Sequence, residues 1–433
     1  MTFPDQPKPV HFPRAFWTAN VVELFERAAY YGMFIALTLY LTNVVGFSDI
    51  NAAWIGGVYA GGLYLLPPFS GALADTMGFR RSLLLAFFLL TAGYFTLGAF
   101  PSRALVLPAL LVTMVGGSFI KPIITGTVAK TSDEANRARA YSIFYAIVNI
   151  GAFTGRGLAY PLRLHMGLEA INLYAAALTL LALGAVAFFY RQVDSAVHGT
   201  TFRDVWAAFR GVVTNVRLLM LILIVTGFWV IQQQMYATMP KYVLRTVGPT
   251  ASPEWIANVN PFIVVTMVMF VTHVMKNASA LASMIVGMVL MPVSALCMSL
   301  GGLIEMRSGE DVVIAGILSA HPITVMLVAG ITLQGLAECF ISPRYLEFFS
   351  KLAPRGQEGL YLGFAHLHTF FAAIIGFAVS GYLLNAYCPD PRTLSAEQLV
   401  HAYDKAHYIW YYFTGIGVVA TIALIVFGRL TSK

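Results

Sequence analysis

Apolar stretches long enough to cross a lipid bilayer recur along the whole of this 433-residue chain. A helix needs about 20 mostly apolar residues to span the hydrocarbon core, so this repetition limits the possible folds more than any other feature. Hydrophobic residues make up 58% of the chain and charged residues only 11%. The sequence therefore predicts an all-α polytopic membrane protein.

The apolar stretches predict twelve spans, and an even number places both termini on the same side of the membrane. On that side the sequence carries sixteen lysines and arginines, against seven in the opposite loops. Because positive residues concentrate on the cytoplasmic side, both termini are predicted to be cytoplasmic. The predicted spans are 17–46, 52–74, 82–100, 104–129, 139–163, 168–190, 216–246, 255–275, 278–303, 320–350, 358–385 and 406–430.

The longest polar segment on the cytoplasmic side divides the chain into two halves. We predict an N-terminal six-helix bundle at 1–191, a cytoplasmic linker at 192–215 and a C-terminal six-helix bundle at 216–433. Residues 202–210 of the linker are amphipathic, and we expect them to lie along the membrane surface. This layout resembles that of major facilitator transporters, which implies a substrate site near the midplane between the halves.

The loop after the second predicted span contains a second sign of this fold. Its sequence matches the motif G-x-x-x-D-x-x-G-x-R-R of major facilitator transporters. Gly78 permits a tight turn there, and Asp75 can pair with a neighbouring helix end or arginine. The resemblance implies a conformational latch between helices, whereas the alternative is an ordinary charged turn. The residues of the motif are Gly71, Asp75, Gly78, Arg80 and Arg81.

Three charged residues lie inside the first predicted span. Glu23, Glu26 and Arg27 are spaced three and four apart, which places Glu23 on the same helical face as the other two. A charge in hydrocarbon costs at least ~2.5–3.5 kcal/mol, so such residues usually pair and mark a proton or substrate path. Two acids and one base in one membrane helix suggest proton handling.

These charges are part of a longer series of motifs. Glu23-x-x-Glu26-Arg27, followed by Tyr30-Tyr31-Gly32, resembles the first-helix signature of the proton-dependent oligopeptide transporter family. Further resemblances follow in the same order along the chain, and together they identify the chain as a member of that family. They are Phe119-Ile120-Lys121-Pro122, the run Phe144 to Gly151, Gly227-Phe228-Trp229 with Gln234, Asn260-Pro261, and Glu338 with Ser342-Pro343.

The resemblance implies roles for two groups of residues. Proton coupling would involve Glu23, Glu26, Arg27, Lys121 and Glu338, and we expect Lys121 to pair with Glu23 or Glu26. The alternative is a static buried ion network, or helix packing by the tyrosines and asparagines. The candidate substrate-binding residues are Tyr30, Tyr31, Phe34, Lys121, Asn149, Arg156, Trp229, Gln233, Asn260 and Glu338.

The sequence also departs from the family pattern. An arginine usually follows Tyr-Tyr-Gly, but Met33 and Phe34 stand here, and the seventh-helix acid is replaced within Gln232-Gln233-Gln234. Arg156 lies seven residues after Asn149 and thus on the same helical face. We hypothesise that Arg156, with Lys121, replaces the lost arginine as a carboxylate clamp. The alternative is an arginine that extends to the outer membrane interface.

His366 and His368 are expected on different faces of the eleventh span. Histidine titrates near physiological pH, so His366 is open to two interpretations, proton transfer or helix packing.

The resemblance implies a proton-coupled importer of di- and tripeptides or peptide-like zwitterions that works by alternating access. We expect no cofactor, since the proton gradient drives transport, no metal site and no enzymatic activity. The expected partners are a small zwitterionic or anionic substrate, protons and the lipid bilayer, not nucleic acid. The expected location is the bacterial inner membrane. The alternatives are a transporter of a non-peptide organic anion or modified amino compound, and a non-transporting sensor.

Overall fold

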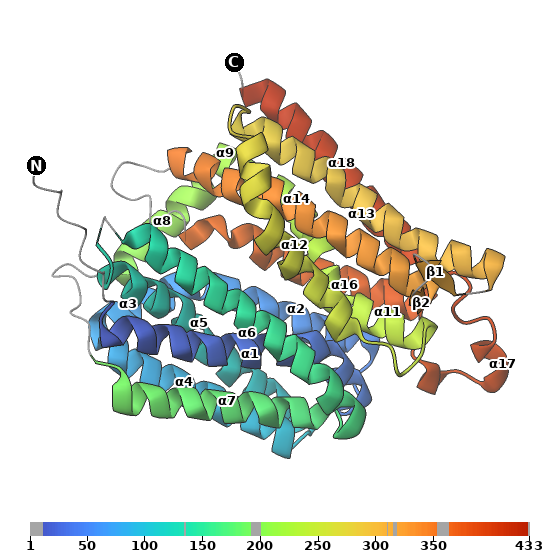
Figure 1. Cartoon of the computed structure of the whole chain (residues 1–433), viewed down its shortest axis with the longest axis horizontal. Helices are drawn as coiled ribbons and strands as arrows, with labels where there is room; N and C mark the ends of the chain where they lie inside the picture. Colours follow the sequence, from blue (N-terminus) through green and yellow to red (C-terminus); the bar gives the residue numbers. More distant parts are fainter. Residues whose placement is uncertain are drawn as a thin grey trace, which may run out of the picture.

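The computed structural model describes residues 12–133, 136–191, 201–309, 311–314, 318–352 and 363–431. In this part of the chain the fold is almost entirely helical (Figure 1), with one antiparallel pair of short strands, β1 (Val312–Ile314) and β2 (Leu318–Ala320). The N-terminal half contains α1 (Arg14–Asn43), α2 (Asp49–Leu65), α3 (Pro67–Met77), α4 (Phe79–Ala99), α5 (Arg103–Lys130), α6 (Arg137–His165) and α7 (Leu168–Phe189).

The second half follows a connecting helix, α8 (Phe202–Thr214). It contains α9 (Val216–Gln232), α10 (Gln234–Ala237), α11 (Met239–Thr246), α12 (Pro253–Val274), α13 (Ala280–Ser308), α14 (Pro322–Leu352), α16 (Leu367–Tyr387), the 3-10 helix η1 (Pro391–Thr393), α17 (Ala396–Leu399) and α18 (Tyr408–Thr431).

Every predicted span coincides with helix in the part of the chain that the structure describes. Nine of these helical segments are long and apolar enough to cross a membrane. The other three predicted spans correspond to α1 and α6, which carry several charges, and to the pair α2 and α3. The all-helical prediction is confirmed, and the number of twelve crossings stays a prediction.

The predicted spans 52–74 and 216–246 are interrupted helices rather than continuous ones. The span 52–74 breaks at Leu66, because Pro67 and Pro68 have no N–H to donate to the preceding turn. The span 216–246 breaks twice, first at Gln233 and then at Thr238. The helix that follows Thr238, α11, has Pro240 in its first turn. Hydropathy locates a span but does not report such breaks.

The two halves contact each other through a few helices. One buried apolar cluster comes mainly from the N-terminal helices and another mainly from α9 to α18. Between the halves, α2 packs on α16, α6 on α12, and α1 on α10 and α11. Glycine permits this approach, since a Cβ at Gly57 would lie 3.0 Å from the Phe377 side chain and one at Gly381 2.7 Å from Ala53.

The amphipathic segment of the linker forms α8, which a capping box between Thr201 and Asp204 begins. Its buried side chains, Val205 among them, pack against the protein, while Trp206 remains 61% exposed. Part of the apolar face is therefore covered by the protein itself. Its position along a membrane surface stays a prediction, and residues 192–200 of the linker lie outside the described residues.

The predicted latch motif lies at the turn between α3 and α4. Gly78 has a φ of 85°, a conformation that suits glycine, so the predicted tight turn is confirmed. Arg80 donates to the carbonyl oxygen of Ala187 on α7 at 2.8 Å. Gly71 lies close to α5, since a Cβ there would be 3.3 Å from Pro122. The motif thus joins four helices of one half, and its role as a latch stays a prediction.

Candidate functional site

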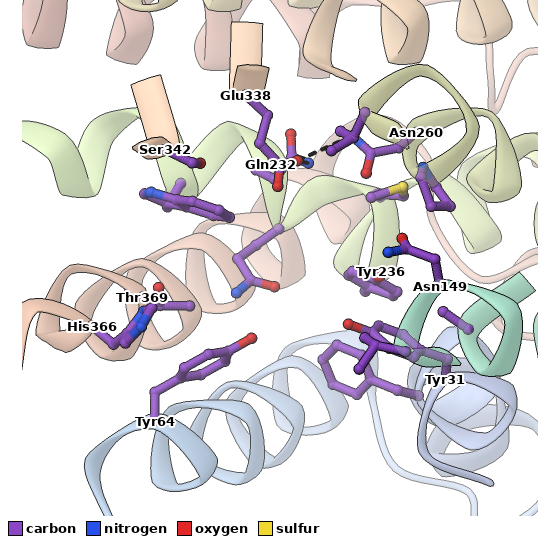
Figure 2. A pocket seen from close by; sticks show the side chains of 18 of the residues that line it. Tyr31, Tyr64, Asn149, Gln232, Tyr236, Asn260, Glu338, Ser342, His366 and Thr369 are labelled. Carbon is purple, nitrogen blue, oxygen red and sulfur yellow. Dashed lines mark hydrogen bonds between the residues drawn. The ribbon is translucent and has the colours of Figure 1, made fainter. Parts of the chain in front are cut away.

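A cavity of about 420 Å³ lies between the two halves. Side chains from both halves surround it, as Figure 2 shows for Tyr31, Tyr64 and Asn149 opposite Glu338. The structure brings all ten candidate substrate-binding residues to this one cavity, namely Tyr30, Tyr31, Phe34, Lys121, Asn149, Arg156, Trp229, Gln233, Asn260 and Glu338.

The acid of the C-terminal half, Glu338, projects from α14 toward two amide side chains (Figure 2). Gln232 donates its Nε2 hydrogen to Oε2 of Glu338 at 3.1 Å, and Asn260 donates from Nδ2 to the same oxygen at 3.4 Å. No basic side chain among the described residues forms an ion pair with it. Glu338 therefore has an oxygen, Oε1, that neither amide occupies.

The arginine of α6, Arg156, points inward and is only 3% exposed. Its Nη2 donates to the Tyr236 hydroxyl at 2.5 Å and its Nη1 to Oδ1 of Asn258 at 3.4 Å. The guanidinium also lies over the ring of Tyr31, 4.6 Å from the centroid. The interpretation of an arginine extending to the membrane interface is therefore wrong.

The electrostatics of Arg156 are unusual for a buried group. Both polar partners are neutral, its Nε is buried without a partner, and no carboxylate within the described residues pairs with it. A buried cation without a counter-ion is costly, so the site favours an anionic group. Its partners Tyr236 and Asn258 belong to the other half, so this one side chain joins both halves.

The three charges of α1 form a closed group of their own. Arg27 contacts Glu26 at 2.5 Å and Glu23 at 3.2 Å, and both glutamates are buried. The expected ion pair between Lys121 and one of the two glutamates is not formed. Arg27, which lies on α1 together with both glutamates, already contacts both carboxylates. Lys121 instead exposes its side chain to the cavity.

Aromatic rings line the wall of the cavity that the N-terminal half forms. Phe34 stacks on Tyr30 with ring centroids 5.2 Å apart, and it lies 4.6 Å from the ring of Tyr236. Phe34, which stands where the family pattern has an arginine, is thus part of an aromatic cluster.

Comparison with known proteins adds to this geometry. The sequence model described as Major Facilitator Superfamily matches residues 20–309. The chain belongs to the major facilitator superfamily. It is 24% identical to dipeptide and tripeptide permease A of Salmonella typhi over 495 aligned positions, which cover 97% of this chain and 92% of that one.

Solved structures show the same fold for this major facilitator. A POT family transporter in complex with 5-aminolevulinic acid has a TM-score of 0.76 at 16% identity, with 97% of both chains covered. Another, in complex with a thioalcohol conjugated peptide, has a TM-score of 0.75 at 17% identity, again with 97% of both chains covered. The resemblance to the proton-dependent oligopeptide transporter family is confirmed.

The superfamily member has a second polar region that the sequence analysis missed, at the end of the bundle away from the first residues of α1 and the last residues of α18 (Figure 1). Asp49 of α2 contacts Lys241 at 2.7 Å and Arg245 at 2.8 Å, both on α11. Arg163 of α6 contacts Glu254 of α12 at 2.6 Å. We call these five residues the distal ion pairs, and they join the two halves.

The loop after α16 adds to this region. Arg392 donates to the carbonyl oxygens of Thr42 at 3.0 Å and Asn43 at 3.3 Å, at the end of α1. Its hydrogen bonds to Asp390 hold the pKa of that carboxyl below its ordinary value. These contacts link residues about 350 positions apart in the chain.

The cavity also contains residues that the sequence analysis did not assign to it. His366 and His368 were expected on different faces, yet both line the cavity with their rings 5.9 Å apart, since α16 begins only at Leu367. The described residues contain no group of three or more potential metal ligands. The other unassigned residues that line the cavity include Tyr64, Tyr145, Gln232, Tyr236, Ser342, Tyr345 and Thr369.

Proposed function

We propose that the protein is a proton-coupled importer of di- and tripeptides or peptide-like zwitterions, working by alternating access. One observation carries the proposal. Cationic side chains from the N-terminal half, Arg156 and Lys121, and an acid from the C-terminal half, Glu338, line the same cavity without pairing with one another within the described residues. The permease relative supports a peptide as the substrate.

Each end of a zwitterion has a matching group in this cavity. The unoccupied oxygen of Glu338 accepts hydrogen bonds from the substrate amine, while Gln232 and Asn260 hold the carboxylate in place. Arg156 clamps the substrate carboxylate, with Lys121 as a second cation. Because these groups belong to opposite halves, a bound zwitterion draws the halves together and favours closure around itself.

The α1 charges supply the coupling to protons. Glu23 and Glu26 share one cation, Arg27, so protonation of either acid weakens its hold on that guanidinium. The guanidinium of Arg27 is then free to form other contacts, and this favours the conformation in which the cavity opens to the other side of the membrane. The proton gradient and the membrane potential drive the cycle, without a cofactor and without catalysis.

The orientation follows from the charge bias of the loops. With both termini in the cytoplasm of a bacterial inner membrane, the distal ion pairs close the outward side of the cavity. The motif around Asp75 and Gly78 then lies on the cytoplasmic side, as a latch that rearranges when the halves rock.

A second candidate substrate is a small non-peptide amino compound. Phe34 and its aromatic neighbours make this wall of the cavity apolar and leave Arg156 to recognise the carboxylate. A solved relative binds 5-aminolevulinic acid, which has an amine and a carboxylate but no peptide bond.

Uptake of labelled dialanine into proteoliposomes under an inward proton gradient tests the proposal. We expect accumulation that an uncoupler abolishes, and loss of gradient-driven uptake in Glu26→Gln. The control is Glu305→Gln, at a residue in contact with His321 outside the cavity. The absence of dialanine uptake by folded wild-type protein, with uptake of 5-aminolevulinic acid, would favour the second candidate instead.

A further inference from the structure

His368 lines the cavity, and one of its ring nitrogens has no hydrogen-bond partner among the described residues. Its Nδ1 lies 2.6 Å from the carbonyl oxygen of Ala365. A carbonyl oxygen only accepts hydrogen bonds, so Nδ1 carries the hydrogen of the ring. The other nitrogen, Nε2, has no hydrogen-bond partner among the described residues. It is also shielded from solvent, since the whole residue is only 2% exposed.

Neighbouring side chains fix the orientation of this ring. The ring of Trp229 lies 5.3 Å from it and that of Tyr345 4.8 Å, nearly perpendicular at 82°. Tyr345 donates its hydroxyl hydrogen to the same Ala365 oxygen at 2.8 Å, so it does not serve Nε2. No acidic side chain in the described part of the chain pairs with the ring, and a buried charge without a counter-ion is costly. The neutral ring therefore offers Nε2 as a hydrogen-bond acceptor.

A second unpartnered polar atom lies on the same half. Oγ of Ser342 is buried and has no hydrogen-bond partner among the described residues. Ser342 follows Glu338 by four residues on α14, and both line the cavity (Figure 2). Four residues of helix rise about 6 Å, so Ser342 lies one turn from the acid on the same face. The cavity wall thus carries an acid and, one turn away, a hydroxyl.

We propose that His368 and Ser342 form a subsite for an amide side chain on the first residue of the substrate. The inference rests on the proposed function, in which Glu338 holds the substrate amine. The first side chain branches from the carbon that bears this amine, and about 6 Å suits the length of a glutamine side chain. Its N–H donates to Nε2 of His368, and its carbonyl accepts from the hydroxyl of Ser342.

Two chemical features make an amide the best fit. An amide has a donor and an acceptor at one tip, which matches the acceptor Nε2 and the donor hydroxyl. The flat ring of Trp229 beside His368 packs well against a planar group. A methionine side chain has the same length but cannot donate, so it would leave Nε2 buried without a partner, which is unfavourable.

Isothermal titration of the full-length protein in detergent with Gln-Ala, Met-Ala and dialanine tests the subsite. We expect Gln-Ala to bind about fivefold more tightly than Met-Ala, the effect of roughly one hydrogen bond. His368→Asn keeps a donor for Ala365 but removes the acceptor at Nε2, so it should abolish this preference. His368→Gln, which retains a polar group near Nε2, should preserve part of it, and Ser342→Ala should reduce it.

The outcomes separate the subsite from the proposed function. Equal affinities of wild-type protein for Gln-Ala and Met-Ala, with dialanine bound, would overturn the subsite alone. A preference that survives unchanged in His368→Asn would overturn it as well. Failure of all three peptides to bind would overturn the proposed function and the subsite together.

Discussion

The distal ion pairs and the cavity are two polar regions built from the same residue types, yet their charges are arranged in opposite ways. At the distal end, Asp49 is shared by Lys241 and Arg245, and Glu254 is held by Arg163. In the cavity, the side chains that contact Arg156 and Glu338 within the described part of the chain are neutral.

The difference separates two uses of buried charge. Ion pairs across the halves join two surfaces directly and need no ligand, so they hold one end of the bundle closed. Unpaired charges from opposite halves leave positions for a ligand that carries the complementary groups, which adds a link between the halves to the one that Arg156 makes with Tyr236 and Asn258. A transporter needs both, because one end must stay closed while the site at the centre responds to the substrate.

Loss of the shared acid at the distal end should have the largest effect. Asp49→Asn leaves Lys241 without its counter-ion and leaves Arg245 with only Asp390, at 4.0 Å. Breaking a buried pair of this kind costs about 3–5 kcal/mol. We expect the closed distal end to open. Double electron–electron resonance between spin labels at Asn51 and Thr250, exposed residues of opposite halves, should show a new population at longer distance.

The matched control is Glu397→Gln, an exposed acid of α17. It should leave the distance distribution unchanged. If Asp49→Asn also leaves it unchanged, the distal ion pairs do not hold this end closed.

Loss of the cavity cation should weaken substrate binding without opening the distal end. Arg156→Gln removes the guanidinium that faces the substrate carboxylate, and hydrogen bonds to charged groups contribute about 1.5–3 kcal/mol. Dialanine affinity, measured by titration, should fall about 10- to 100-fold. The dialanine affinity of Arg156→Lys should lie between that of the wild type and that of Arg156→Gln, since lysine keeps the charge but loses the fork of donors. Unchanged affinity in both variants would exclude the clamp.

The smallest effect is expected from the partner that orients this arginine. Tyr236→Phe removes the hydroxyl that accepts from Nη2 of Arg156 but keeps the ring that packs on Phe34. Loss of one such hydrogen bond should reduce dialanine affinity about two- to fivefold. A loss as large as that in Arg156→Gln would mean that Tyr236 contacts the substrate itself.

The features that could be predicted from the sequence depend on a spacing within one helix or on a motif within one short segment. Asn149 and Arg156 lie seven apart in one helix, and both line the cavity as that spacing predicts. The tight turn at Gly78 follows likewise from a local motif.

Contacts between distant segments could not be predicted in this way. Asp49 and Lys241 are 192 residues apart, and no spacing rule relates them. Lys121 was expected to pair with a glutamate of α1, but Arg27 competes for both acids from the same helix. The cavity position of His368 depends on where α16 begins, which hydropathy does not fix.

Binding of dialanine and N-acetyl-dialanine to wild-type protein and to Glu338→Gln, measured by titration, tests most directly whether the cavity recognises the two ends of a zwitterion. The acetyl group removes the charge of the amine and leaves the carboxylate. We predict that wild-type protein prefers dialanine at least about tenfold, and that Glu338→Gln binds both ligands equally. An equal preference for dialanine in the wild type and in the variant would contradict the assignment of Glu338 to the substrate amine.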